Sequence, residues 1–238
     1  MLSYLNFRKG WVDKFGMKVI VVIPAYNEER TIKSVIKEVK EHSDEIIVVD
    51  DGSIDRTGEI ARESGAQVLH HIINLGLGAS ITTGVKKALK DGGEIILTFD
   101  ADGQHRAEDI FRLIEPIKKR EAQVVIGSRL LDPRGMPFHR RVYNWLANLV
   151  TFILFGIWVT DSQSGLRAFS RQAAQSLDLK TSKMEVSSEI IKEIKAHKLD
   201  LKEIPISAVY TDYSLSKGQN FIVGLKTFWK LFLRKIIK

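Results

Sequence analysis

The chain has 238 residues, is 44% hydrophobic and 27% charged, carries a net charge of +7 and contains no cysteine. This length suits a large domain with a buried core, and the ordinary apolar content argues against disorder. Without cysteine there are no disulfides, thiolate metal sites or cysteine nucleophiles, so a bound metal needs oxygen or histidine ligands.

The positive charge is concentrated near the C-terminus. No acidic residue follows Asp212, whereas residues 213–238 carry six basic ones. Residues 1–212 contain 30 basic and 29 acidic residues and are therefore close to neutral. A nucleic-acid enzyme more often spreads its positive charge over a face or channel, so we predict no nucleic-acid partner.

Predicted strands and helices alternate along the first half of the chain. Residues 1–16 show no secretion signal and form a leader before the first strand. Residues 17–23 are a continuous β-branched run, typical of a strand that is buried on both faces, and residues 29–42 have helical spacing. This alternation predicts βαβ units and a mostly parallel α/β sheet flanked by helices. The further predicted strands are 45–49, 66–70, 94–99 and 122–126, and the further predicted helices are 55–64, 77–90 and 107–119.

The alternation stops near residue 128. Residues 129–141 are predicted to form a Pro/Gly loop with four arginines and one acidic residue. Residues 142–160 carry no charge and are long enough to span a bilayer, but Asn144 and Asn148 lie one turn apart and argue against a simple span. We expect a helix packed on the domain with one apolar face toward lipid or an acceptor chain; an ordinary core helix is the alternative. A strand at 165–170, a helix at 185–195 and a strand at 199–209 complete the prediction.

An acidic motif follows the strand predicted at 94–99. In an extended strand end, Asp100, Asp102 and Gln104 would point to one side because they alternate in sequence. Three oxygen side chains at a sheet edge suit a hard divalent cation, Mg²⁺ or Mn²⁺. The alternative is an acidic turn that caps the next helix, because Asp-Gly is common in turns.

Polar residues also follow the first two predicted strands. The first strand is followed by a proline turn in which Pro24, Tyr26 and Glu28 supply an aromatic ring and a carboxylate, groups that suit a base and a ribose. The second strand is followed by Asp50 and Asp51, which can accept hydrogen bonds from a base. Neither a complete GxGxxG nor a GxxxxGK[ST] motif is present, which argues against dinucleotide and P-loop chemistry. Parallel sheets bind ligands at the carboxyl ends of their strands, where all three clusters are expected. Helix capping is the alternative at both positions.

The segments IPAYNEE, VVDDGS, DADGQH, GSR and DSQSGLRAF together resemble those of family 2 glycosyltransferases. The resemblance is to the polyprenyl-phosphate glycosyltransferases, which include dolichol-phosphate mannose synthase, and it covers residues 17–218. It implies a GT-A fold, that is, a Rossmann-like nucleotide-diphospho-sugar transferase domain over residues 17–212. The nucleotide-binding half would be 17–128 and the acceptor-binding half 129–212.

The same resemblance implies roles for individual residues. It identifies Asp100, Asp102 and Gln104 as metal ligands and implies contacts of Arg129 and Arg140 with the acceptor phosphate. Asn144 stands where some members have serine and is included in the acceptor site. Thr211 replaces an expected arginine, which leaves Lys217 as the cation of that segment. The implied nucleotide-sugar contacts are Pro24, Tyr26, Glu28, Asp50, Asp51, Asp100, Ala101, Asp102 and Lys217, and the implied catalytic residues are Asp102, Arg129 and Arg140.

The predicted reaction transfers a sugar from GDP-mannose or a UDP-hexose to polyprenyl or dolichyl phosphate, with inversion and a divalent metal. A phosphate monoester is mostly ionised near neutral pH, so it needs positioning more than a general base. Asp161 is a weaker candidate for a polar role near the acceptor, and His105 is either a supporting group or a capping histidine. The alternatives are a family 2 transferase with a glycan or soluble acceptor, and a nucleotide-sugar-binding protein without turnover.

The last predicted element is a basic amphipathic helix within residues 213–238. Aromatic and aliphatic side chains share one face of it, and Lys226, Lys230 and Arg234 lie opposite. This pattern is typical of a helix in the membrane interface, and the alternatives are docking on the core or packing in a homo-oligomer. We therefore predict peripheral attachment to the cytoplasmic face of the cell membrane.

Overall fold

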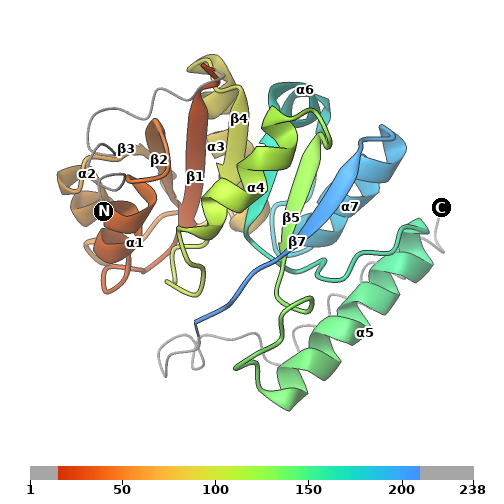
Figure 1. The fold of residues 1–238 in the computed structure, drawn as a ribbon. Coiled ribbons are helices and arrows are strands. Elements are labelled where there is room, and N and C mark those ends of the chain that lie inside the picture. Colours follow the sequence, from red (N-terminus) through yellow and green to blue (C-terminus); the bar gives the residue numbers. More distant parts are fainter. Residues whose placement is uncertain (1–15, 210–238) are drawn as a thin grey trace, which may run out of the picture.

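The computed structural model describes residues 16–209, which form a three-layer α/β fold (Figure 1). Its central sheet has seven strands in the order β3-β2-β1-β4-β6-β5-β7, and β6 alone among them runs antiparallel to its neighbours. The predicted mostly parallel α/β sheet is confirmed. The strands are β1 (Val19–Ala25), β2 (Glu45–Asp50), β3 (Gln67–His70), β4 (Ile95–Thr98), β5 (Val124–Ser128), β6 (Arg167–Ser170) and β7 (Leu201–Pro205). The helices are α1 (Ile32–Val39), α2 (Thr57–Glu63), α3 (Leu77–Lys90), α4 (Asp109–Lys118), α5 (Phe138–Phe155), α6 (Arg171–Ser176) and α7 (Val186–Ala196).

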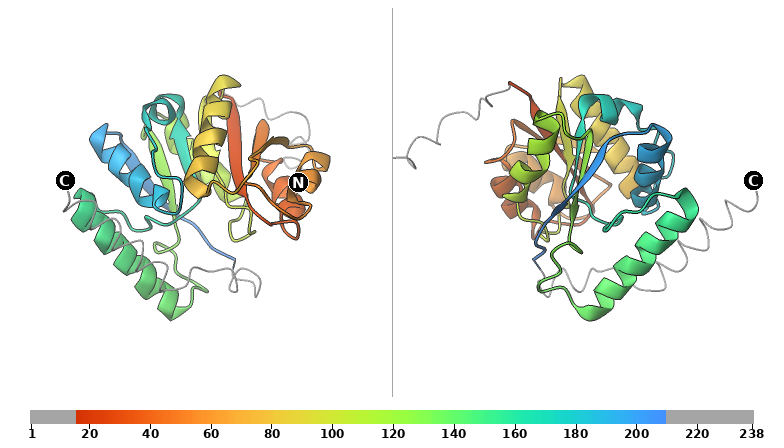
Figure 2. Two further views of the ribbon diagram at one scale, coloured as in Figure 1. Left: turned by 180° about the vertical axis from the view of Figure 1, so that it is seen from behind. Right: turned by 45° about the vertical axis from the view of Figure 1, so that its right-hand side comes forward.

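Two hydrophobic cores form because alternate residues of the central strands point to opposite faces of the sheet. On β1, Val21 and Ile23 pack with α1, α2 and α4, whereas Ile20 and Val22 pack with α3, α6 and α7. Helix α3 lies especially close to the sheet, because a Cβ atom added at Gly84 would lie 2.2 Å from a methyl group of Val22. The central strands are therefore covered on both faces, whereas the edge strands β3 and β7 are partly exposed (Figure 2).

Most predicted elements appear close to their expected positions, and α3 has the predicted bounds. Strand β1 extends further than predicted and includes Pro24 and Ala25. A proline is tolerated here because Pro24 pairs with β2 on one side, whereas the pairing of β1 with β4 stops at Val22. The short helix α6 was not predicted. Most of the predicted leader, the C-terminal amphipathic helix and Lys217 lie outside the described residues.

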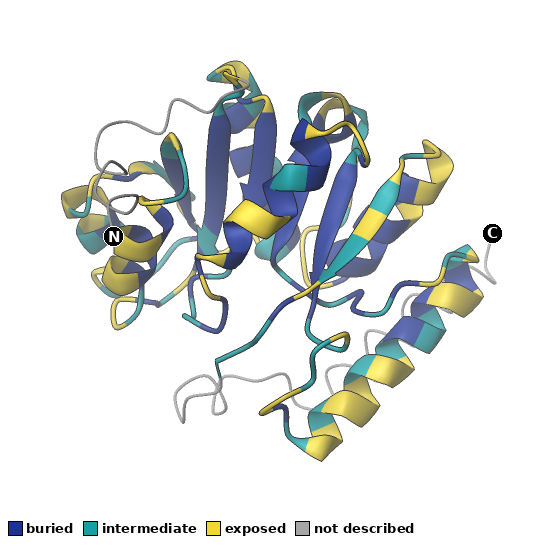
Figure 3. Cartoon of the chain, viewed as in Figure 1, coloured by how far each residue is buried: buried dark blue, intermediate teal, exposed yellow. Residues whose placement is uncertain are grey.

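Helix α5 lies apart from the three layers, beside the end of the sheet where the parallel strands terminate (Figure 1). It begins at Phe138 and ends at Phe155, and the C-cap residue Gly156 adopts a left-handed conformation with φ of 67°. Residues 138–141, which we predicted as the end of the loop, are therefore helical. The uncharged run of residues 142–160 is helical only as far as Phe155, so it does not form one continuous helix. Only Asn148, Thr151 and Leu154 of α5 are buried, so the core-helix alternative is also wrong (Figure 3).

Candidate active site

The loops that follow β1 and β2 are joined by hydrogen bonds at the carboxyl edge of the sheet. The Asn27 amide donates to Ser53 Oγ at 3.0 Å, and the Ile54 amide donates to Asn27 Oδ1 at 3.0 Å. The Glu28 amide donates to Thr57 Oγ1 at 2.7 Å. Asn27 has a φ of 54°, a conformation that asparagine tolerates better than most residues. The two motifs therefore hold each other in place.

Asp50 and Asp51 are buried and bind neighbouring loops of the protein itself. Asp50 accepts from the Ser53 amide at 3.0 Å, and its other oxygen lies 3.0 Å from His70 Nδ1. Asp51 accepts from the amides of Leu75 and Gly76 at 3.0 and 2.7 Å. Both carboxylates thus have hydrogen-bond partners within the protein, α2 has Arg56 at its N-cap with no side-chain capping hydrogen bond, and a nucleotide contact of either carboxylate stays a prediction.

The residues predicted to line the base and ribose differ in their accessibility. The Tyr26 ring is 45% exposed at the sheet edge, where a planar base could stack on it. Glu28 is buried and accepts from Thr31 Oγ1 at 3.1 Å, and Ala101 is buried as well. Pro24 is half-buried in β1. Tyr26 is therefore the member of this set that is most open to a ligand.

The acidic motif forms a turn, and not the extended strand end that we predicted. Strand β4 ends at Thr98, and Gly103 has a φ of 74°. The turn lets the Gln104 side-chain amide donate to Asp102 Oδ2 at 2.6 Å and its backbone amide donate to Oδ1 at 3.0 Å. His105 is buried and places Nε2 3.0 Å from Asp100 Oδ2. Asp100, Asp102 and Gln104 are thus brought together by the turn and its hydrogen bonds.

The two carboxylates of this motif affect each other's ionisation. Burial and the charge of Asp100 raise the pKa of Asp102. For Asp100, burial acts in the same direction, but the hydrogen bond and charge of His105, with the charges of Arg129 and Arg167, lower its pKa. Two neighbouring carboxylates with oxygen ligands fit a hard divalent cation, which would relieve their repulsion. The described residues contain no cluster of three or more His, Cys, Asp or Glu side chains that could hold a metal ion, and the assignment of Asp100, Asp102 and Gln104 as metal ligands stays a prediction.

Strand β6 and the segment just before it supply two residues whose importance the sequence did not show. A Cβ atom at Gly165 would lie 2.1 Å from both carboxylate oxygens of Asp100, so any other residue there would displace that carboxylate. Arg167 is fully buried, and burial lowers its pKa to about 10. It donates to the Ser162 carbonyl at 2.7 Å, and its Nε has no hydrogen-bond partner in the described part of the chain. Both lie within the quoted DSQSGLRAF segment, which gave no role to either.

Arg129 is held in a buried ion pair with Asp161. Its backbone amide, Nε and Nη2 donate to the two Asp161 carboxylate oxygens at 3.0, 2.7 and 2.9 Å. The side chain of Asp161 is fully buried, and that of Arg129 is 13% exposed. Asp161 therefore contributes more than the weak prediction from sequence suggested, because it orients the predicted acceptor-binding arginine.

The other three arginines of this region are placed differently. Arg134 forms an exposed ion pair with Asp132, and Arg141 donates to the carbonyls of Met136 and Pro133. Arg140 lies in the first turn of α5. Asn144, Asn148 and Thr151 follow Arg140 by four, eight and eleven residues, so they lie on the same face of α5 as Arg140. Asn148 and Thr151 are buried against the domain. The structure thus places Arg140 and Asn144 on the side of α5 toward the domain.

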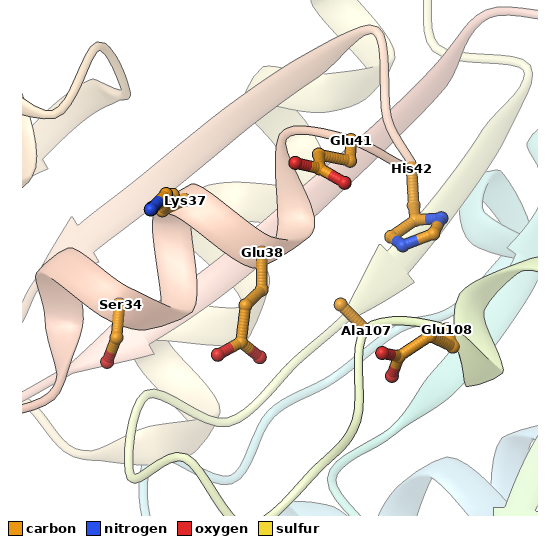
Figure 4. Close-up of a pocket in the computed structure, with 7 residues that line it drawn as sticks. All are labelled: Ser34, Lys37, Glu38, Glu41, His42, Ala107 and Glu108. Carbon is orange, nitrogen blue, oxygen red and sulfur yellow. The ribbon is translucent and has the colours of Figure 1, made fainter. Parts of the chain in front are cut away.

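An apolar pocket of about 430 Å³ adjoins the Arg129–Asp161 pair. Leu130 and Thr160, the chain neighbours of that pair, line it together with residues of α5 and Trp158. Another cavity, of about 280 Å³, lies between α1 and the start of α4 (Figure 4). Its walls are Ser34, Lys37, Glu38, Glu41, His42, Ala107 and Glu108, none of which belongs to the predicted site.

The comparison with protein families identifies the class of this site. The model of glycosyl transferase family 2 matches residues 20–178, which is most of the chain. The chain belongs to this family. The identification made from the five sequence segments is confirmed, and with it the expectation of a sugar-transferring enzyme.

Individual relatives and solved structures agree with the family assignment. UDP-N-acetylglucosamine–dolichyl-phosphate N-acetylglucosaminyltransferase of Methanococcus voltae is 40% identical over 92% of this chain and 97% of its own length. Undecaprenyl-phosphate mannosyltransferase of Micrococcus luteus is 30% identical over 87% of this chain and 90% of its own. Glucosyl-3-phosphoglycerate synthase from Mycobacterium tuberculosis, in complex with Mn²⁺, UDP and phosphoglyceric acid, superimposes with a TM-score of 0.71 at 23% identity, covering 91% of this chain and 76% of that one. The predicted GT-A fold is confirmed.

Proposed function

We propose that this family 2 glycosyltransferase transfers a hexose from a nucleoside-diphosphate sugar to the phosphate of a polyprenol. One observation carries the proposal: a carboxylate turn, a mostly buried arginine and an apolar pocket lie next to one another beside the sheet edge. The charge of Arg129 lowers the pKa of Asp100, and Leu130, the next residue, lines the pocket. The names of the Methanococcus voltae and Micrococcus luteus relatives, which specify dolichyl-phosphate and undecaprenyl-phosphate, support this acceptor class.

The donor side of the proposed site is the carboxylate turn. We assign Asp100, Asp102 and Gln104 to a divalent cation, Mg²⁺ or Mn²⁺, and Tyr26 to the base; the Mn²⁺ and UDP of the structural neighbour support this choice. When bound, such a cation supplies positive charge to the leaving nucleoside diphosphate. Asp100 is hydrogen-bonded to His105 and packs closely against Gly165, and Asp102 is hydrogen-bonded to Gln104, so the two carboxylates are oriented before the donor binds.

The acceptor side is formed by Arg129, Arg140 and the apolar pocket. Arg129, fixed by Asp161, and Arg140 bind and orient the acceptor phosphate, whose second pKa of about 6 leaves it ionised at neutral pH. Catalysis then consists of positioning the phosphate for in-line attack on the anomeric carbon, with inversion and without a covalent enzyme intermediate. The first isoprene units would occupy the pocket of about 430 Å³ beside Arg129.

A transfer assay tests the donor and acceptor classes together. Purified protein is incubated with Mn²⁺ or Mg²⁺, a panel of UDP- and GDP-sugars, and either polyprenyl phosphate, phosphoglyceric acid or no acceptor. We expect one sugar to be transferred to polyprenyl phosphate and that donor to raise the melting temperature by mass action. Transfer to phosphoglyceric acid alone would favour a soluble acceptor, and donor binding without turnover would favour a regulator.

We also propose that α5 faces the membrane that holds this acceptor, as part of a peripheral attachment to the cytoplasmic face. None of the helices within residues 16–209 is long and apolar enough to cross a bilayer. Phe138, Leu146 and Ile153 are exposed and share the face of α5 opposite to its buried residues. Such an apolar face is typical of a helix that lies in the membrane interface. The amphipathic pattern in residues 213–238 would add to the attachment.

Membrane attachment through α5 predicts a specific loss in flotation experiments. Replacing Phe138 and Ile153 with serine should reduce flotation with anionic liposomes several-fold, because two large apolar side chains are lost from the interface. Donor-induced thermal stabilisation should stay unchanged. The control, Ile72→Ser, removes an exposed apolar side chain from the loop after β3. Flotation equal to that of the wild type in the double variant would contradict the role of α5.

A further inference from the structure

The segment of residues Thr160, Asp161 and Ser162, here called the 160–162 strap, is held on one side by α5. Asn148 Nδ2 donates to the Thr160 carbonyl at 2.5 Å, and Asn148 Oδ1 accepts from the Ser162 amide at 2.9 Å. Asn148 is 2% exposed and is one of the few buried residues of α5. One side chain therefore binds the main chain on both sides of Asp161.

Strand β7 holds the strap from another side. Both carboxylate oxygens of Glu203 accept from the Thr160 amide, at 2.8 and 3.0 Å, and Oε1 also accepts from Thr160 Oγ1 at 2.7 Å. The same oxygen accepts from the Asp161 amide at 3.3 Å. Ser128, at the end of β5, places its Oγ 2.6 Å from Thr160 Oγ1. The strap is thus fixed to two strands of the sheet and to α5.

We propose that the 160–162 strap positions Arg129 and that Asn148 and Glu203 are its positioning residues. Within residues 16–209, the side-chain hydrogen bonds of Asp161 all go to Arg129, so the position of the guanidinium follows that of the strap. Because Asn148 belongs to α5, the same contacts link Arg129 to the helix whose opposite face is apolar and exposed. Docking of that face on lipid would then orient the arginine that receives the lipid-linked phosphate. The part of this inference that concerns the acceptor rests on the proposed function.

Kinetics of Asn148→Ala and Glu203→Gln test the positioning role. For both variants we expect kcat/KM for polyprenyl phosphate to fall about ten- to a hundredfold, since a small displacement of an orienting group is enough for such a loss. The KM for the nucleotide sugar and the slow hydrolysis of the donor by water should stay within about twofold, because the carboxylate turn is not touched. Two variants are used so that poor folding of one leaves the test intact.

Leu154→Ala is the matched control, because Leu154 is a buried residue of α5 outside the strap contacts. It should lower the melting temperature through loss of packing without the selective effect on acceptor kinetics. An acceptor-specific loss in Leu154→Ala equal to that in Asn148→Ala would overturn the proposal, because general loosening of α5 would then explain both. Unchanged acceptor kinetics in Asn148→Ala and Glu203→Gln would also overturn it.

A second readout does not depend on the acceptor. In protein labelled with ¹⁵N-arginine, the Arg129 Nε–H signal, assigned with Arg129→Lys, should exchange slowly with water because it donates to buried Asp161. Exchange should be at least about tenfold faster in Asn148→Ala than in Leu154→Ala. Equal exchange in the two variants would contradict the strap itself. If the wild type fails to use polyprenyl phosphate but this difference is observed, the proposed acceptor is wrong and the strap stands.

Discussion

Asp102→Asn should reduce sugar transfer about a thousandfold, the size of effect seen when a site loses a charge that organises its electrostatic centre. Asparagine has the same shape as aspartate but is neutral, so the hydrogen bond from the Gln104 backbone can persist while the affinity for a divalent cation is lost. Wild-type protein should gain about 2.7 kcal/mol of stability when Mn²⁺ is at a hundredfold excess over its dissociation constant. The variant should gain almost none, which a thermal-shift titration measures.

Without metal, the same variant should be at least as stable as the wild type. A carboxyl whose pKa is raised on folding binds its proton more tightly in the folded state, so its ionised form at neutral pH lowers stability. Removing that charge also removes its repulsion with Asp100. Asp178→Asn is the control, because Asp178 is an exposed aspartate paired with Lys180 and distant in sequence from the turn. A Mn²⁺-induced shift of wild-type size in Asp102→Asn would refute the metal assignment.

Asp161→Asn should destabilise the fold by about 3–5 kcal/mol, because breaking a buried ion pair leaves an uncompensated charge inside the protein. For a domain of this size, this corresponds to a decrease in melting temperature of roughly 10 °C. Asp161 accepts three hydrogen bonds from Arg129, of which a neutral amide oxygen can retain only some. The double variant with Arg129→Met should lose less stability than the sum of the two single variants. Additive losses would show that the pair does not act as a unit.

The pH dependence of stability provides a second test of this pair. Burial tends to raise the pKa of Asp161, but the charge and hydrogen bonds of Arg129 outweigh it and lower that pKa. A carboxyl of this kind stabilises the fold above its unfolded pKa of about 4, and the stabilisation is lost as the pH falls through the lower folded value. The difference in unfolding free energy between wild type and Asp161→Asn should therefore shrink below about pH 4. Asp132→Asn, which breaks an exposed pair with Arg134, should change the melting temperature far less.

The donor half of the site was predictable because its residues follow buried parallel strands. The apolar runs of β1, β2 and β4 predicted the end of each strand to within two residues, and the carboxyl ends of parallel strands share one edge. The extended geometry that we expected to bring Asp100, Asp102 and Gln104 to one side was nevertheless wrong. A positive φ at Gly103 makes a turn where alternation predicted an extended end, and this depends on hydrogen bonds to Asp102 that no periodicity shows.

The acceptor half was harder to predict because its contacts join residues far apart in sequence. Arg129 and Asp161 are 32 positions apart, and Thr160 and Glu203 are 43 positions apart. The antiparallel strand β6 brings Gly165 and Arg167 beside Asp100, although nothing in their local pattern distinguishes this strand from a parallel one. The buried polar residues at these contacts look in sequence like ordinary loop residues.

The sequence by itself determined the family, the mostly parallel sheet and the residues of the carboxylate turn, because strand hydropathy and short motifs are local properties. It also showed that residues 1–212 are nearly neutral and that the excess positive charge lies after Asp212. Only the tertiary structure decided that Asp50 and Asp51 bind neighbouring loops, that Arg129 is paired with Asp161, and that α5 exposes its apolar face. Each of these depends on which distant groups satisfy a buried charge or cover an apolar surface, and chain packing sets those partners.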